Sequence, residues 1–245
     1  MSDTPATPPP PPPPPAGDTR TPAWKSRRAW IVLLVVTVFG VASDLATKTI
    51  AFRTVGPQPA LSDAVDGALL SGRFGDAARA AKDFRERVGG SGFLSSLVAP
   101  GSTVRVIPNV LELSLVYNHG AVFGIGAGKR WAFILFTFGA LAFALWMFGW
   151  WTGPRDRWAH AAIGLLIAGG LGNLYDRLVY ACVRDFIHPL PGVKLPFGWT
   201  LPSGERDLWP YVSNLADLWL IVGIGVLMVS LFRHPHPRRA AQPTA

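Results

Sequence analysis

The sequence predicts an all-α membrane protein built as a four-transmembrane-helix bundle. Of its 245 residues, 49% are hydrophobic and 16% are charged, a balance more apolar than that of an ordinary soluble domain. Four apolar segments are long enough to cross a hydrocarbon layer of about 30 Å. Tryptophans lie near the edges of these segments, as is typical of chains that cross a bilayer interface: Trp30, Trp131, Trp150, Trp151, Trp158 and Trp209.

The four apolar segments define the expected organisation of the chain. The first follows basic residues, as a signal peptide does, but it continues into a charged helix, so we expect a retained anchor. The second and third are separated by a short Gly-Pro-Arg-Asp-Arg turn and should form a hairpin. We expect one domain covering 29–232, with spans at about 29–52, 131–153, 158–177 and 211–232. Its outer loops are expected at 53–130 and 178–210. A disordered Pro-rich tail, 1–28, precedes the domain, and a basic tail, 233–245, follows it.

Basic residues indicate the orientation of the bundle. Because the number of spans is even, both termini lie on one side of the membrane. Short segments on that side carry nine Lys and Arg residues, against three in loop 178–210, and basic residues favour the cytoplasmic side. Both tails are therefore expected in the cytoplasm and both long loops outside.

The first outer loop contains two segments with a local pattern. Within residues 76–88, oppositely charged side chains recur four positions apart, which predicts a short exposed helix. Within residues 110–117, Leu111, Leu113 and Leu115 alternate with polar side chains, which predicts a strand. A small extramembrane strand region is therefore expected beside the bundle.

Polar residues in or beside the spans converge. Ionisable groups are expensive inside a bilayer, so their positions are informative. The alternation of the spans places five polar groups at the same membrane face, whichever way the bundle is oriented. Each group alone could serve only to join helices, but together they predict one polar site. The groups are Asp44 with Lys48; Asn118 with His119 and Gly120; Asn173 with Asp176 and Arg177; Asp185; and Asn214 with Asp217.

Two acids of this set suggest a chemistry. If the fold brings Asp185 and Asp217 together, their mutual repulsion raises the pKa of one of them. One carboxylate then acts as a base and one protonated acid as a donor, an arrangement that activates water for peptide hydrolysis. Asp176 could replace Asp185 in this pair, although the neighbouring Arg177 favours a structural ion pair for it.

Other chemistries find little support in the sequence. No His-Glu-x-x-His motif occurs, and the histidines lack ligand spacing, so no metal and no cofactor is expected. A single cysteine, Cys182, forms no internal disulfide, and its apolar neighbours favour a packing role over that of a nucleophile with His188. The net charge of +8 is spread along the chain, so nucleic-acid binding is not expected.

Five motifs, in order, resemble those of the bacterial lipoprotein signal peptidase family, also called signal peptidase II, the aspartic peptidases of family A8. They cover about residues 29–232, and together they are far more specific than any one alone. The motifs are Asp44-Leu-Ala-Thr-Lys48, Tyr117-Asn-His-Gly-Ala-Val-Phe-Gly124, Gly172-Asn-Leu-Tyr-Asp-Arg177, Val183-Arg-Asp-Phe-Ile187 and Asn214-Leu-Ala-Asp217.

The resemblance implies roles for individual residues. Asp185 and Asp217 match the family's catalytic pair. Asp44 and Lys48 match a pair that is structural or contacts substrate. The remaining residues match positions that line the substrate-binding site: Asn118, Gly120, Asn173, Arg177 and Asn214. The chain departs from the family pattern in its Pro-rich tail, its long first outer loop, a long loop between the two aspartates, and Ser213, where the family often has an aromatic residue.

The resemblance also implies a fold and a function. The fold would add a small extracytoplasmic β-cradle and a short interfacial helix to the bundle. The function would be that of a membrane aspartic endopeptidase of the bacterial cytoplasmic (inner) membrane, with its site near the outer face. It would remove the signal peptide from diacylglyceryl-modified prolipoproteins, cutting before the lipidated cysteine, with prolipoproteins and membrane lipids as its partners and no cofactor.

Two alternatives use the same features differently. A small proton- or ion-coupled membrane transporter would use the same acids as a relay, but it requires polar residues through the full membrane thickness, and the second span is uncharged. A scaffold that recruits partners through the Pro-rich tail and the long loop would tolerate replacement of the buried acids.

Overall fold

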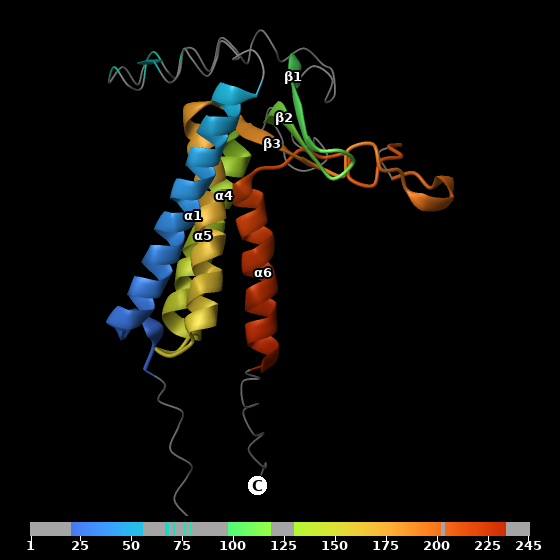
Figure 1. Cartoon of the computed structure of the whole chain (residues 1–245). Helices are drawn as coiled ribbons and strands as arrows, with labels where there is room; N and C mark the ends of the chain where they lie inside the picture. The colour runs from blue at the N-terminus through green and yellow to red at the C-terminus, as the bar shows by residue number, and fades with distance from the viewer. Residues whose placement is uncertain are drawn as a thin grey trace, which may run out of the picture.

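The computed structural model describes residues 21–55, 98–118, 130–201 and 204–233, together with positions 67, 68, 71, 76 and 79. This part of the chain forms four long helices that run side by side and a small sheet at one end of them (Figure 1). In chain order the elements are η1 (Ala23–Lys25), α1 (Arg27–Thr54), β1 (Val98–Ile107), β2 (Leu111–Asn118), α4 (Arg130–Trp146), the π-helical turn η4 (Met147–Trp151), α5 (Arg157–Val179), β3 (Val183–Pro189), η5 (Pro196–Gly198) and α6 (Leu215–Arg233).

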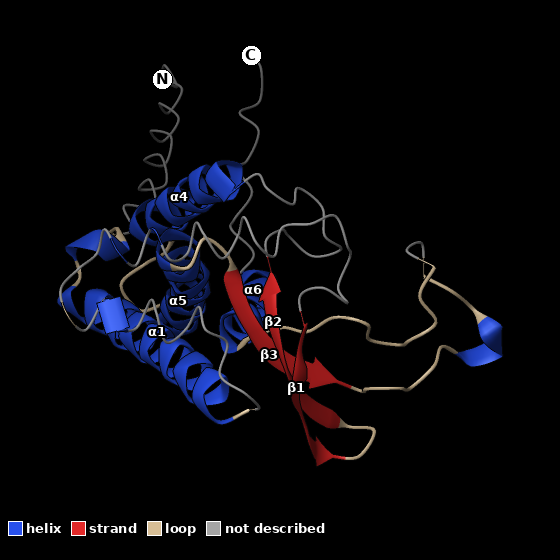
Figure 2. Ribbon diagram, turned by 90° about the horizontal axis from the view of Figure 1, so that it is seen from above, coloured by secondary structure: helices blue, strands red, loops and turns tan. Residues whose placement is uncertain are grey.

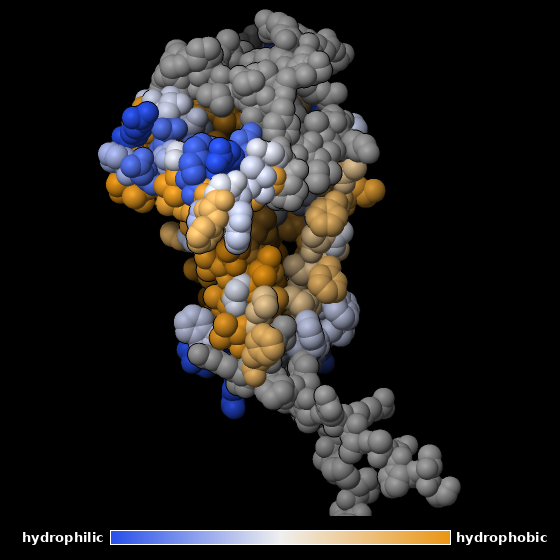
Figure 3. Space-filling model, turned by 90° about the vertical axis from the view of Figure 1, so that its right-hand side faces the viewer, coloured by the Kyte–Doolittle hydropathy of each residue, from blue (hydrophilic) through white to orange (hydrophobic). Residues whose placement is uncertain are grey.

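The outer surface of the bundle is apolar. Two helices, α1 and α4 continued through η4, are long and apolar enough to cross a membrane, with 28 and 22 residues, and α6 is a shorter apolar helix. Their large side chains face outward: Phe39 on α1, Phe136 on α4 and Phe232 on α6 are 63%, 74% and 80% exposed. On the face that Figure 3 shows, hydrophobic residues cover the middle of the bundle as an apolar belt, with hydrophilic residues towards both ends. A belt of this kind is suited to contact with lipid.

The central helix of the bundle is α5, which packs against α1, α4 and α6. Glycines allow neighbouring backbones to approach it closely. A Cβ at Gly169 would lie 2.5 Å from the backbone oxygen of Ala216 on α6, and a Cβ at Gly172 would overlap the carboxylate of Asp44 on α1. This packing brings three helix ends together beside the sheet: the end of α1, the end of α5 and the start of α6.

The sheet has the strand order β1-β2-β3 and is antiparallel throughout. The strand predicted at 110–117 is confirmed as β2, but its alternation is interrupted by an irregularity between Leu113 and Val116, so that residues 114–117 are all buried. The two flanking strands are additional to that prediction. An apolar cluster joins the sheet to the end of the bundle, and its large members are Phe52, Leu115, Tyr117, Tyr180 and Phe186.

The predicted hairpin between the second and third apolar segments is confirmed. The Asp156 carboxylate accepts a hydrogen bond from the Gly153 backbone N–H at 2.8 Å, and α5 begins at the next residue, Arg157. The start of α1 packs beside this turn, where the Ala23 N–H donates to the Thr152 carbonyl at 3.0 Å. The helix predicted at 76–88 lies outside the described residues, apart from positions 76 and 79.

The fourth helix begins later than predicted. It was expected from residue 211, but α6 begins at Leu215 because the preceding chain is held extended by the sheet. Ser213 pairs with Ile187 of β3, each backbone N–H donating to the other's carbonyl at 2.8 Å. As a result Asp217, which was expected well inside the helix, lies in its first turn.

Candidate active site

Asp185 is held on β3 by two asparagines that donate to its carboxylate. β3 lies against β2, with Asp185 opposite Val116. Asn118, at the end of β2, donates from Nδ2 to Asp185 Oδ2 at 3.0 Å. Asn214, just before α6, donates from Nδ2 to Asp185 Oδ1 at 2.6 Å. With both oxygens occupied and the residue only 2% exposed, the carboxylate has one defined orientation.

Asp217 is held by the start of its own helix. Asn214 Oδ1 accepts from the Asp217 backbone N–H at 3.1 Å, and Asp217 Oδ2 accepts from the Asn214 backbone N–H at 3.3 Å. This reciprocal pair is a capping box, which satisfies two backbone donors at a helix start. The other oxygen, Oδ1, accepts from Asn173 Nδ2 of α5 at 2.9 Å. The carboxylate is thereby fixed at the positive end of the helix dipole.

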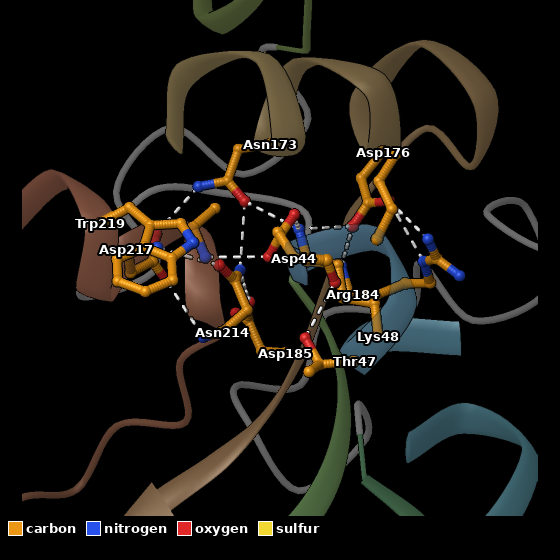
Figure 4. Close-up of polar contacts among 12 residues, drawn as sticks. Asp44, Thr47, Lys48, Asn173, Asp176, Arg184, Asp185, Asn214, Asp217 and Trp219 are labelled. Carbon is orange, nitrogen blue, oxygen red and sulfur yellow. Dashed lines mark hydrogen bonds and ion pairs between the residues drawn. The ribbon is translucent and has the colours of Figure 1, made fainter. Parts of the chain in front are cut away.

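Asn214 connects the two acids. Its Nδ2 donates both to Asp185 Oδ1 and to Asn173 Oδ1, the latter at 3.1 Å, while its Oδ1 caps the helix at Asp217. Figure 4 shows both Asp185 and Asp217 beside this residue. Burial is the largest effect that raises the pKa of the Asp185 carboxyl, followed by the nearby charge of Asp217, and together they bring this pKa to about 8. The hydrogen bonds from Asn118 and Asn214 act in the opposite direction and lower it.

Beside the two acids lies a fully buried charge cluster that joins α1, α5 and β3. Lys48 Nζ lies 2.8 Å from Asp44 and 3.1 Å from Asp176, and the Arg184 guanidinium lies 2.9 Å from Asp176. The ion pairs of Asp176 are therefore with Lys48 and Arg184, which corrects the expectation that Arg177 is its partner. Two acids and two bases balance the cluster, as burial of charge requires.

Lys48 also links this cluster to Asp217 through Asn173. It donates to Asn173 Oδ1 at 3.2 Å, and the same oxygen accepts from Asn214. Because the carbonyl side of the Asn173 amide is occupied by two donors, its NH2 group faces Asp217. The lysine therefore determines how the amide is oriented, although it does not itself touch Asp217.

Arg184 is the main polar residue that the sequence interpretation gave no role, although it lies in one of the quoted motifs. Adjacent residues of a strand point to opposite sides, so on β3 Arg184 points to Asp176 while Asp185 points to Asn214 (Figure 4). The Arg184 guanidinium also lies over the ring of Tyr180, 4.1 Å from its centroid. Had residues 183–189 been predicted as a strand, its alternation would have indicated that Arg184 and Asp185 face opposite sides and have different roles.

The other predicted residues lie around this centre. Arg177, one turn beyond Asn173, lies over the Phe133 ring at 5.2 Å, and its charge interacts with both Asp185 and Asp217. Gly120 lies outside the described residues. Cys182 is buried, and burial raises the pKa of its thiol, which opposes a nucleophilic role. In the described part of the chain, no group of three or more His, Cys, Asp and Glu side chains could hold a metal ion.

Comparison with known proteins connects this geometry to a family. The family described as "Signal peptidase (SPase) II" matches residues 92–233, which include the sheet, α4, α5 and α6. The lipoprotein signal peptidase of Desulfitobacterium hafniense is 32% identical over 146 residues, which are 58% of this chain and 82% of that protein. The one from Leifsonia xyli is 35% identical over 140 residues, 56% of this chain and 57% of that protein.

The fold agrees with this assignment. A bacterial membrane enzyme solved by the in meso method superimposes with a TM-score of 0.50 at 22% identity, covering 86% of this chain and 94% of that one. At this level of identity the likeness concerns the fold alone. Together, the family match over more than half of the chain and the identity to its members show that this chain belongs to the signal peptidase II family of membrane peptidases.

Proposed function

We propose that the chain is an aspartic endopeptidase that removes the signal peptide from diacylglyceryl-modified prolipoproteins, cutting before the lipidated cysteine, with Asp185 and Asp217 as its catalytic pair. One observation carries the proposal: two carboxylates are held by a shared asparagine at the end of an apolar bundle. Family membership makes peptide hydrolysis the expected reaction, and it gives no support to the transporter and scaffold alternatives.

Different roles for the two acids follow from their surroundings. The raised pKa of Asp185 keeps its carboxyl protonated at neutral pH, so it would donate a hydrogen bond and then a proton to the scissile carbonyl oxygen. Asp217 would accept a proton from water, whose oxygen adds to the carbonyl carbon. When the C–N bond of this tetrahedral intermediate breaks, the proton held by Asp217 passes to the leaving amine, and Asp185 recovers its own.

The surrounding polar residues would fall into two groups. Asn118 and Arg177 are only partly buried and close to the acids, so they would hold the substrate backbone or the lipid linkage. Asp44 and Lys48 are fully buried and paired, which favours the structural role over substrate contact. Asn173 and Asn214 are also buried and hydrogen-bonded within the protein, so they would hold the two acids in position in the wall of the substrate site.

The membrane would hold the bundle so that the scissile bond meets water. We assign α1, α4 with η4, α5 and α6 as four spans of the bacterial cytoplasmic membrane, with both tails in the cytoplasm. Figure 1 supports the assignment, because the start of α1, the hairpin turn and the end of α6 lie at one end of the bundle and the sheet lies at the other. The exposed apolar faces would then receive the signal helix and the acyl chains.

The proposal is tested by comparing two precursors with the same sequence. The purified full-length protein is mixed with a prolipoprotein that carries a diacylglyceryl group on its cysteine, or with the unmodified form, and products are identified by mass spectrometry. We expect a single cut before the cysteine and only with the lipidated precursor. Equal cleavage of both forms would refute the lipid requirement, and no cleavage of either would refute the proposed activity.

A further inference from the structure

The chain between β3 and α6 forms an arm, defined here as residues 190–201 and 204–210. It leaves the bundle sideways, at the height where α6 begins, and ends in η5 (Figures 1 and 2). It follows Asp185 along the chain and precedes Asn214. The catalytic chemistry proposed above uses none of its residues.

The middle of the arm is a short paired ribbon. The Leu195 N–H donates to the Arg206 carbonyl at 2.8 Å, and the Leu208 N–H donates to the Val193 carbonyl at 2.7 Å. Between these two bonds, the side chains of Lys194 and Asp207 form an ion pair. At its start the arm is joined to the sheet, because the Leu190 N–H donates to the Val110 carbonyl at 2.9 Å.

Two aromatic side chains project from the tip. Phe197 is 89% exposed and Trp199 is 65% exposed, and their ring centroids lie 5.8 Å apart. Phe197 also has φ 58° and ψ 16°, in the left-handed region that favours glycine or asparagine. A large apolar residue therefore occupies a position where both the backbone and the surrounding water disfavour it.

The surroundings of the tip favour lipid as the partner. Leu208 and Trp209 at the base of the arm are exposed, and they continue towards the exposed Leu218 in the first turn of α6, where the apolar belt begins. The arm runs across the bundle axis at this height, so its tip would meet the same bilayer interface some way from the helices. Tryptophan is enriched at that interface, and tryptophan and phenylalanine are the side chains with which segments lying at the interface contact lipid. Lys194 and Asp207 are paired with one another, and the two other charged residues of the arm, Glu205 and Arg206, are of opposite sign, so the arm offers no net charge to a charged partner.

We propose that Phe197 and Trp199 insert into the outer interface of the bilayer and fix the sheet, with Asp185, at a set height above the membrane. The inference rests on the membrane placement given under the proposed function. It goes beyond that function because it assigns a lipid contact to a segment outside the active site. A fixed height would keep the acids level with a bond that lies beside a lipid anchor.

Spin labels on single cysteines test the contact in the full-length protein in phosphatidylethanolamine–phosphatidylglycerol vesicles. The chain suits this experiment, because its native thiol, Cys182, is buried and protected from labelling. Labels at Phe197→Cys and Trp199→Cys are compared with Phe136→Cys, on the lipid-facing side of α4, and Arg155→Cys, in the exposed hairpin turn. Depth is measured from collisions with oxygen, which enters lipid, and with a nickel chelate, which stays in water.

We expect the ratio of oxygen to nickel collisions at both tip positions to exceed that at the Arg155 position several-fold and to remain below that at the Phe136 position. Tip labels as water-exposed as the Arg155 label would overturn the proposal. So would dipolar broadening between copies, which indicates a second chain as the partner, or protection that occurs only when lipidated precursor is added. A water-exposed label at the Phe136 position would instead refute the membrane placement, and with it this proposal, whereas peptidase activity is measured separately.

A second pair of variants removes the concern that the label itself seeks lipid. The label is placed at Leu208→Cys, at the base of the arm, with either the native tip or the tip Phe197→Asn/Trp199→Ser. Asparagine tolerates the left-handed backbone, so the ribbon should stay folded. We expect the Leu208 label to lose its protection from the nickel chelate when the aromatic rings are removed. An unchanged collision ratio would show that the rings do not hold the arm to the membrane.

Discussion

Replacing Asp176 with asparagine should destabilise the protein more than replacing either of the proposed catalytic acids. The Asp176 carboxylate is fully buried and forms ion pairs with Lys48 and Arg184. It also accepts a hydrogen bond from the Arg184 backbone N–H at 3.0 Å. In Asp176→Asn the cluster keeps two bases but only one acid, Asp44, so one unit of positive charge is left buried without compensation.

The expected loss is large compared with the stability of a typical domain. Breaking a buried ion pair by removing one partner costs about 3–5 kcal/mol, whereas the whole free energy of unfolding is about 5–15 kcal/mol. Asp176→Asn should therefore be recovered in low yield and unfold at a clearly lower temperature. Removing the opposite charge as well, in Asp176→Asn/Arg184→Met, should restore part of the loss, because the buried cluster is again neutral.

Thermal unfolding of the detergent-solubilised protein, followed by size-exclusion chromatography, measures the difference. Asp207→Asn is the matched control, because it breaks an ion pair of the same chemistry whose lysine is exposed, and such pairs contribute about 0–1 kcal/mol. A stability of Asp176→Asn equal to that of the control would refute the idea of a balanced buried cluster. A double variant less stable than Asp176→Asn would refute the electrostatic cause.

Three further predictions concern pH, packing and the position of Asp217. The folded chain keeps the Asp185 proton up to a higher pH than an unfolded aspartate does. The free energy of unfolding should therefore fall as pH rises from about 4 towards about 8, and cleavage should decline as pH rises through about 8. In pH-titrated melts, Asp185→Asn should remove this part of the pH dependence of stability. In thermal melts, Gly172→Ala should lower the free energy of unfolding by about 1–3 kcal/mol, because the new Cβ overlaps the Asp44 carboxylate. The control Gly139→Ala places its Cβ in open space and should be neutral or slightly stabilising. Equal effects of the two changes would contradict the packing argument. Asn173→Ala should lower the single-turnover rate at saturating substrate on the order of 100-fold, since it frees Asp217 to turn, and an unchanged rate would show that the amide does not position the acid.

The helices were predictable because their information is local. Hydropathy and length are enough to find an apolar helix, and the Gly-Pro turn marks the hairpin. The start of α6 was misplaced because Tyr211 and Val212 are apolar and extend the hydrophobic run, although they form no helix. The better signal was the pair Asn214 and Asp217, which stand at the spacing of a capping box.

The sheet and the charge cluster were harder to predict because they depend on contacts between distant segments. Strand β3 shows no simple alternation, since a buried arginine and a buried aspartate stand side by side on it. Arg184 is tolerated there only because Asp176 lies opposite it across the chain reversal at residues 180–182. Sequence adjacency pointed to Arg177 as the partner of Asp176, and only the folded chain shows which arginine faces the carboxylate.

The central claim is that Asp185 and Asp217 together carry out hydrolysis. The most direct test measures single-turnover cleavage of a lipidated precursor by three variants: Asp185→Asn, Asp217→Asn and the control Asp207→Asn. Each change removes a carboxylate at almost constant volume, and folding is checked by size-exclusion chromatography. We expect the first two variants to be folded and to lose cleavage, and the control to cleave at the rate of the unmodified protein. Measurable turnover by either folded Asp185→Asn or folded Asp217→Asn would contradict the claim.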